Sequence, residues 1–213
     1  MKMDLNGNNT ILPELDKMIN ETMKIMQIFK IHSKRRVETM AIFDQVDSTG
    51  SKMKLGHDEA TQKIFHHNII CRQIVKKMNG TVIKDTGDGV LTRFLDPMNA
   101  CLCAINIQHA INKADIVTRG ALSMGMVEEA HFTDYVDLYG TAVDLCSRIE
   151  KCALPNQILI DKTLYDSINT FLRDHDDIHV SEPMSVELKG LGNHSLYEIS
   201  YKDYPLKNKL NSF

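Results

Sequence analysis

The chain has 213 residues, 43% hydrophobic and 25% charged, which is the size and balance of one globular domain with a short extra segment. A net charge of −3 argues against binding nucleic acid through a basic surface, and no run approaches the about 20 apolar residues that cross a bilayer. The first residues, MKMDLNGNN, lack the pattern of a signal peptide, so we expect a cytoplasmic protein without stable membrane insertion.

The first part of the chain predicts a helix followed by a strand. Residues 13–31 have apolar side chains at helical spacing, and we treat residues 1–36 as an N-terminal helical segment. The basic run KIHSKRR, residues 30–36, is interpreted as the solvated C-terminal end of this helix, where positive charge complements the helix dipole. Residues 37–46 then read as a buried strand.

From residue 57 onward the pattern alternates between helices and strands. The pattern predicts a helix at 57–78, a hairpin of strands 80–86 and 89–95 around the turn TGDG, and a helix at 97–113. A long strand at 116–127 and a short strand just before 140 follow, and then a helix at 140–152. The last predicted elements are a strand at 156–161, a helix at 162–173 and a closing hairpin at 185–200. The central order is β-α-β-β-α-β, which predicts an α+β, ferredoxin-like fold over residues 37–201 with a C-terminal extension, followed by a tail at 202–213.

Cysteine and histidine show no metal-ligand spacing. The neighbours His66 and His67 lie on a predicted helix and point in different directions, so they do not form a joint metal site. The five cysteines are expected to be small buried side chains in a reducing compartment: Cys71, Cys101, Cys103, Cys146 and Cys152.

Two aspartates stand at the ends of predicted strands. Asp44 follows the apolar run of the first strand, and Asp88 lies in the hairpin turn. In a βαββαβ sheet the first strand and the hairpin are neighbours, so both acids can meet at one end of the sheet. Each acid alone reads as a turn or cap residue, but together with a backbone carbonyl of Gln45 or Val46 they form an oxygen site suited to Mg²⁺ or Mn²⁺.

The loop after the first strand adds hydroxyl and amide groups. The amides and hydroxyls of Ser48 and Thr49 are placed to bind a triphosphate next to this cation.

Five sequence blocks resemble the catalytic domain of class III nucleotidyl cyclases. They are FDQVDST, IKDTGDGVLTRF, RGALSMG, DLYGTAVDLCSRIE and LPNQILID, and the resemblance covers about residues 37–199. It implies an enzyme that converts a nucleoside triphosphate to a 3′,5′-cyclic nucleotide and diphosphate, with two Mn²⁺ or Mg²⁺ ions per site. It also implies a head-to-tail homodimer in which each of two sites uses both chains.

The resemblance assigns roles to individual positions. Asp44 and Asp88 match the metal-binding aspartates. The other matched positions are a triphosphate-contacting arginine, a base-reading lysine and aspartate, an arginine that stabilises the transition state and a phosphate-contacting lysine, at Arg119, Lys84, Asp137, Arg148 and Lys189 respectively.

One position departs from the family pattern. Asp144 stands where the family has an asparagine that holds the ribose, and an ionised aspartate accepts hydrogen bonds but cannot donate one. Asp144 and Arg148 are four residues apart on a predicted helix, so they can pair with each other instead. The substitution also leaves open a catalytically inactive, nucleotide-binding module.

The chemistry implied is attack of the ribose 3′-hydroxyl on the α-phosphorus, with metal activation and no assigned protein base. Lys84 can donate a hydrogen bond and Asp137 can accept one. Adenine and cytosine each present an acceptor beside a donor, so both bases suit this pair. The chain also resembles the stand-alone pyrimidine cyclases of bacterial antiphage defence, which make cyclic CMP or cyclic UMP for a separate effector. An adenylate cyclase of ordinary signalling is the alternative.

Overall fold

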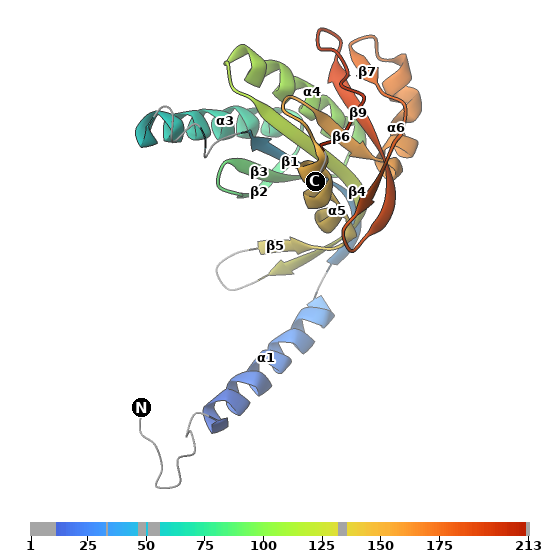
Figure 1. The fold of residues 1–213 in the computed structure, drawn as a ribbon. Helices are drawn as coiled ribbons and strands as arrows, with labels where there is room; N and C mark the ends of the chain where they lie inside the picture. Colours follow the sequence, from blue (N-terminus) through green and yellow to red (C-terminus); the bar gives the residue numbers. More distant parts are fainter. Residues whose placement is uncertain (1–11, 33, 47–49, 51–55, 132–135, 212–213) are drawn as a thin grey trace.

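A computed structural model describes residues 12–32, 34–46, 50, 56–131 and 136–211 (Figure 1). In chain order the elements are α1 (Leu12–His32), β1 (Lys34–Gln45), α3 (His57–Lys77), β2 (Thr81–Asp85), β3 (Gly89–Phe94), α4 (Pro97–Lys113), β4 (Thr118–His131), β5 (Val136–Tyr139), α5 (Thr141–Cys152), β6 (Ile158–Asp161), α6 (Lys162–Asp174), β7 (Ile178–Val180), β8 (Met184–Leu188) and β9 (Gly192–Tyr201).

The strands form one mixed sheet in the order β2-β3-β1-β4-β6-β9-β7, and β5 pairs with β4 while β8 pairs with β9. β1 lies between β3 and β4 and is antiparallel to both, whereas β4 and β6 are parallel. β1, α3, β2, β3, α4 and β4 therefore make the βαββαβ unit that the sequence predicts, and the α+β fold class is confirmed.

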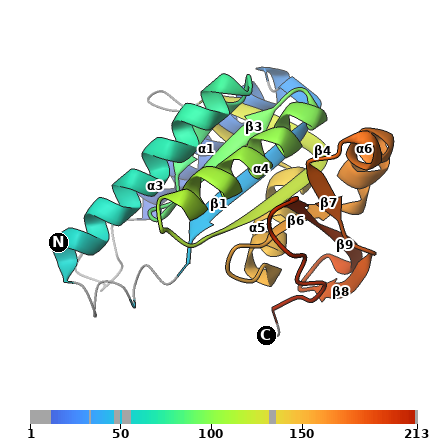
Figure 2. The same ribbon diagram turned by 90° about the horizontal axis from the view of Figure 1, so that it is seen from above.

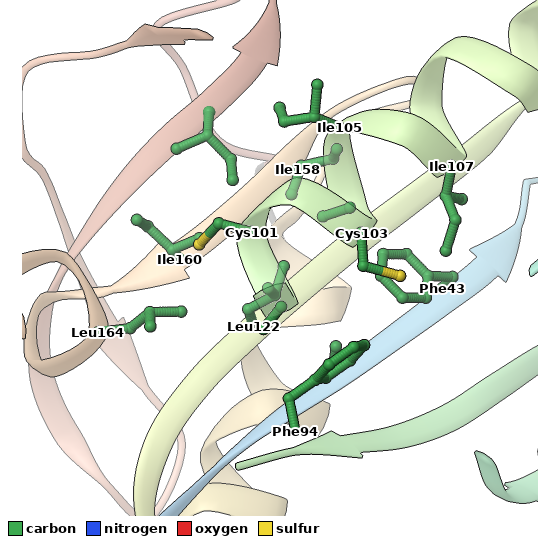
Figure 3. Close-up of a cluster of buried hydrophobic side chains, with 14 of the residues drawn as sticks. Phe43, Phe94, Cys101, Cys103, Ile105, Ile107, Leu122, Ile158, Ile160 and Leu164 are labelled. Carbon is green, nitrogen blue, oxygen red and sulfur yellow. The ribbon is translucent and has the colours of Figure 1, made fainter. Parts of the chain in front are cut away.

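The two faces of the sheet bury two separate sets of apolar side chains. Ala41 and Phe43 of β1 join a core with α3, α4 and α6, whereas Met40 and Ile42 join a core with α5, β8 and β9. This alternation follows from the two-residue period of a strand. Figure 2 shows α3 and α4 lying across the sheet, and Figure 3 shows the side chains of α4 that enter the first core. The sheet is thus held rigidly from both sides.

Most predicted elements match the structure within a few residues, and two regions differ. The basic run forms a helix end only over residues 30–32, because α1 ends at His32 and Lys34, Arg35 and Arg36 already belong to β1. Arg35 Nε donates to Glu128 Oε2 of β4 at 2.9 Å. The three-residue strand β7 was not predicted, because such a short segment carries no periodic signal. All five cysteines are buried and free, as predicted.

The C-terminal segment packs on the domain instead of leaving it. The backbone N–H of Lys207 donates to Glu198 Oε1 at 2.9 Å, and Gln157 Nε2 donates to the carbonyl of Lys209 at 2.9 Å. The N–H of Asn211 donates to the carbonyl of Cys152 at 2.8 Å. These bonds fasten the segment to β9, to the residue before β6 and to the end of α5.

Helix α1 projects away from the sheet in Figure 1, and its side chains from Pro13 to Ile25 are exposed. Within the described ranges, no helix combines the length and the apolar character needed to span a membrane.

Candidate metal and nucleotide site

The strand β1 ends between two partners that bring the predicted metal residues together. Asp44 lies opposite Gly89 of β3 and opposite Arg119 of β4. The N–H of Gln45 donates to the carbonyl of Asp88 at 3.1 Å, which joins the end of β1 to the hairpin turn. The two aspartates therefore meet at one end of the sheet, where the sequence places them.

Gly89 allows the hairpin turn to approach β1 closely. A Cβ at this position would lie 2.5 Å from the carbonyl oxygen of Phe43 and 3.0 Å from Asp44 Oδ1. Real Cβ atoms do not come this close to backbone, so any side chain here would push the turn outward. The glycine thereby keeps Asp88 next to Asp44.

Arg119 lies between two acids. Its Nη2 donates to Asp44 Oδ2 at 2.9 Å, and its Nε lies 3.2 Å from the same oxygen. Its Nε also lies 2.5 Å from Oε1 of Glu150, a buried residue of α5. The sequence reasoning missed Glu150, although this acid stands two residues after Arg148 in the SRIE block. We call Asp44, Asp88, Arg119 and Glu150 the metal end.

The acids of the metal end lie close enough to raise the pKa of Asp44. Burial and the charges of Asp88 and Glu150 raise the pKa of Asp44 from 3.8 to about 7, although Arg119 opposes this shift. Burial likewise raises the pKa of Glu150, again against Arg119. A bound cation would relieve this repulsion, so the electrostatics fit a divalent metal.

The donor set also fits such a metal. Asp44 and Asp88 are hard oxygen ligands, and Mg²⁺ is usually held by one or two carboxylates plus water and substrate phosphate. Within the described ranges, no group of three or more His, Cys, Asp or Glu side chains is placed to hold a metal ion. The N–H of Val46 donates to the carbonyl of Val117 at 2.9 Å. Ser48 and Thr49, predicted to bind phosphate, lie outside the described residues.

Lys84 and Asp137 form an ion pair between β2 and β5. Lys84 Nζ lies 2.9 Å from both carboxylate oxygens of Asp137. Burial opposes the shift, but hydrogen bonds from Lys84 and from the N–H of Leu138 hold the pKa of Asp137 below its ordinary value. The predicted base-reading donor and acceptor are therefore side by side in one chain.

Helix α5 and the turn between β8 and β9 enclose a cavity of about 490 Å³. We call it the α5 cavity, and its lining residues are Asp144, Ser147, Arg148, Lys151, Lys189, Gly190 and Leu191. It contains three further residues that the resemblance selects: Asp144, Arg148 and Lys189. Within the described part of the chain, no hydrogen bond or ion pair joins Asp144 to Arg148, so the pairing considered from the sequence does not form.

Gly140 sets the start of α5. Its φ is +132°, and a Cβ there would lie 2.3 Å from the carbonyl oxygen of Met126 in β4. Only glycine permits both this conformation and this contact. Because α5 begins against β4, Glu150 turns into the metal end while Arg148 stays exposed in the α5 cavity.

The predicted site residues thus fall into three groups. The metal end, the Lys84–Asp137 pair and the α5 cavity each contain part of the set, and the lining of the α5 cavity includes neither Asp44 nor Asp88. The metal end and the lining of the α5 cavity therefore have no residue in common.

No protein-family model matches the chain. Two curated proteins resemble it in sequence. "Putative adenylate cyclase 3" of Rhizobium meliloti (strain 1021) is 33% identical over 122 residues, which is 53% of this chain and 19% of that protein. "Adenylate cyclase" of Glutamicibacter nicotianae is 23% identical over 159 residues, which is 74% of this chain and 38% of that protein. The chain thus matches well under half the length of either relative.

Several solved structures share the fold. An adenylate cyclase of Trypanosoma brucei has a TM-score of 0.72 at 17% identity, covering 82% of this chain and 92% of that one. The guanylate cyclase domain of a Catenaria anguillulae protein in complex with GTP has a TM-score of 0.68 at 19% identity, covering 79% and 98%. A dimeric guanylyl cyclase domain from Blastocladiella emersonii has a TM-score of 0.64 at 17% identity, covering 78% and 97%. At these identities the likeness establishes the fold, which is that of class III cyclase domains.

Proposed function

We propose that the protein is a metal-dependent nucleotidyl cyclase that forms a 3′,5′-cyclic nucleotide and diphosphate from a nucleoside triphosphate. The observation that carries this proposal is the metal end, where Asp44 and Asp88 meet beside Arg119 and the pKa of Asp44 is raised. The shared fold and the names of the relatives support the same reaction.

The proposed chemistry needs binding, charge stabilisation and metal activation. A divalent cation held by Asp44 and Asp88, Mn²⁺ or Mg²⁺, supplies Lewis acidity toward the 3′-hydroxyl and the phosphates. Arg119 donates to Asp44 at the same end of the sheet, so its guanidinium would neutralise charge on phosphates bound there. Arg148 and Lys189 are exposed cations of the α5 cavity and suit the developing charge on the reacting phosphate.

A homodimer with shared sites completes this arrangement. The metal end and the lining of the α5 cavity have no residue in common, and a second copy placed head to tail would set Arg148 of one chain against Asp44 of the other. Such a two-fold arrangement produces two equivalent sites. We place the reaction in the cytoplasm, where triphosphates are abundant, and expect a separate effector to bind the product.

The Lys84–Asp137 pair suggests which base is read. Adenine offers N1 as acceptor and N6 as donor, and cytosine offers N3 and N4 in the same roles, so either base can replace the internal ion pair. Guanine and uracil present the opposite pattern and would leave polar groups unpaired once the base covers them, at about 1–3 kcal/mol for each group. CTP and ATP therefore fit best.

Between these two, we propose a pyrimidine cyclase that makes cyclic CMP, or cyclic UMP, as a messenger in antiphage defence. This choice rests on the sequence resemblance to the defence cyclases. One specific observation favours the alternative, formation of cyclic AMP from ATP, because both curated relatives carry the name adenylate cyclase.

The test is incubation with each of the four triphosphates and Mn²⁺, with the products identified by mass spectrometry. We expect a cyclic nucleotide from CTP or ATP, and rates with GTP and UTP lower by more than about tenfold. Best turnover of UTP or GTP would refute base reading by Lys84 and Asp137. The double variant Lys84→Glu with Asp137→Ser should shift preference toward a keto base.

A protein that binds triphosphate but forms no cyclic product would instead be an inactive nucleotide-binding module. Asp144 is the residue that motivates this outcome. The variant Asp144→Asn would then be the first substitution to examine, because it restores the family's hydrogen-bond donor.

A further inference from the structure

A set of buried polar side chains lies beneath the metal end and has no role in the proposed reaction. His67 and Asn68 belong to α3, and Thr118 is the first residue of β4. Their exposed fractions are 0%, 8% and 2%. Polar groups buried this deeply are stable only with hydrogen-bond partners, so their partners show which parts of the chain they hold in place.

One side of the His67 ring leads to the strand that carries Asp44. His67 Nε2 lies 3.0 Å from Thr118 Oγ1, and this hydroxyl donates to the backbone carbonyl of Asp44 at 3.0 Å. The N–H of Thr118 is also held, at 3.3 Å from Asn156 Oδ1. Thr118 therefore connects the ring to the main chain of the metal-binding residue.

The other side of the ring leads to the hairpin turn. His67 Nδ1 lies 2.9 Å from Asn68 Oδ1, and Asn68 Nδ2 donates to the carbonyl of Gly87 at 3.4 Å. Gly87 directly precedes Asp88 and has a φ of +96°, so its backbone has a conformation that only glycine adopts readily. The side chain of Asn68 thus contacts the turn at the residue before the second metal ligand.

The connection through Thr118 and the connection through Asn68 depend on each other, because few hydrogen atoms are available to form them. Burial lowers the pKa of His67, against its bond to Asn68 and the charge of Asp88, so the ring is neutral and carries one N–H. If Nε2 carries it, the ring donates to Thr118, whose single hydroxyl hydrogen remains for Asp44, but the bare Nδ1 then faces Asn68 Oδ1 with no hydrogen between them. If Nδ1 carries it, the ring donates to Asn68, and the Thr118 hydrogen turns to Nε2 and leaves the carbonyl of Asp44.

We propose that His67 is a positioning residue that couples the two metal-binding loops, because the position of its one ring hydrogen decides whether the ring supports the backbone of Asp44 through Thr118 or that of Gly87–Asp88 through Asn68. The inference rests on the proposed function, because it assumes that Asp44 and Asp88 bind a metal. The ring itself would touch neither metal nor nucleotide.

The test measures Mn²⁺ binding without nucleotide, by titration followed with electron paramagnetic resonance, beside the melting temperature. His67→Phe keeps a buried ring without its nitrogens, and Thr118→Val keeps the shape without the hydroxyl. Both should weaken Mn²⁺ binding about tenfold, the usual size of an effect on metal affinity from outside the ligand shell. Thr118→Ser restores the hydroxyl and should bind as the wild type does. Cys103→Ala removes a fully buried side chain of the same core and should lower only the melting temperature.

The outcomes separate this inference from the proposed function. Absence of Mn²⁺ binding by the wild type, or binding that survives Asp44→Ala with Asp88→Ala, refutes the metal site itself. Wild-type affinity in folded His67→Phe and Thr118→Val, with the metal site intact, refutes only the coupling. If His67→Phe does not fold, the Thr118 pair decides, and equal losses in Thr118→Val and Thr118→Ser would overturn the proposal.

Discussion

The metal end and the α5 cavity differ in how their charged side chains are held. In the metal end, Arg119 is bonded to Asp44 and paired with Glu150 of α5, and the sheet register fixes Arg119 opposite Asp44. In the α5 cavity, Arg148 and Lys189 are exposed and, within the described part of the chain, form no ion pair. One region is preorganised by its own chain, whereas the other presents cations without an anionic partner.

This difference has a simple explanation in the proposed dimer. A metal site needs carboxylates at fixed positions, and β1 with its hairpin neighbour provides them. For Arg148 and Lys189, no ion pair within the described residues would have to be broken when a phosphate binds. The α5 cavity is therefore what one half of a shared site would look like before the other chain and the substrate arrive.

The largest expected effect comes from the carboxylates of the metal end. Asp44→Ala or Asp88→Ala should lower the turnover number by about a thousandfold or more, because each variant removes a metal ligand without removing core volume. Diphosphate release with Mn²⁺ measures the rate, and the melting temperature checks the fold. Asp85→Ala is the matched control, since Asp85 is a nearby exposed acid bonded to Arg72 and should be near wild type. Near-normal turnover by the double variant would contradict the metal assignment.

The next largest effect tests the α5 cavity as half of a shared site. Arg148→Ala should lower turnover by about 10²–10³-fold, because it removes charge stabilisation made in the transition state. Mixed with Asp44→Ala, it should recover about a quarter of wild-type activity, since half of the dimers are mixed and one of their two sites is intact.

The control for this experiment mixes Asp44→Ala with Asp88→Ala. Both variants damage the metal end, so every site in a mixed dimer stays incomplete and no activity should return. Failure of the Arg148→Ala mixture to recover activity, although mass spectrometry shows mixed dimers, would place both regions in a single-chain site.

A smaller effect should follow from loosening Arg119. Glu150→Gln keeps the shape but removes the charge that faces Arg119 Nε, so the arginine is oriented less firmly. We expect about a tenfold rise in KM for the triphosphate with a smaller change in the turnover number, in line with the loss of one hydrogen bond to a charged group. Glu187→Gln is the control, since Glu187 is an exposed acid of β8. Equal KM values in the two variants would show that Glu150 does not position Arg119.

These regions also show what the sequence could and could not predict. The meeting of Asp44 and Asp88 was predictable because local pattern predicts a buried strand and a glycine turn, and the βαββαβ order makes these two neighbours. Glu150 was not, because its burial depends on Arg119 of a distant strand and helical periodicity assigns no partner. The end of the basic run was mispredicted for a related reason: Arg35 lies in β1 because it pairs with Glu128, 93 residues away. Contacts across the sheet leave no local signal in a single sequence.

The smallest effect concerns the charge balance of the metal end without metal. Because the pKa of Asp44 is raised from 3.8 to about 7, its protonated form stabilises the fold, and that stability is lost as the pH rises from 3.8 through about 7. Asp44→Asn carries no charge at any pH. The melting temperature of this variant minus that of the wild type, measured with a chelator, should therefore rise across this window by about 2–4 °C and stay constant above it. Taking the difference removes the titration of groups that both proteins share. Added Mn²⁺ should stabilise only the wild type, because metal replaces the proton on the carboxylate. Above pH 7 the melting temperature of the wild type should then exceed that of Asp44→Asn. A difference that does not change with pH would show that the carboxylates of the metal end do not repel one another, and the contrast between a charged metal end and an open α5 cavity would then lose its electrostatic basis.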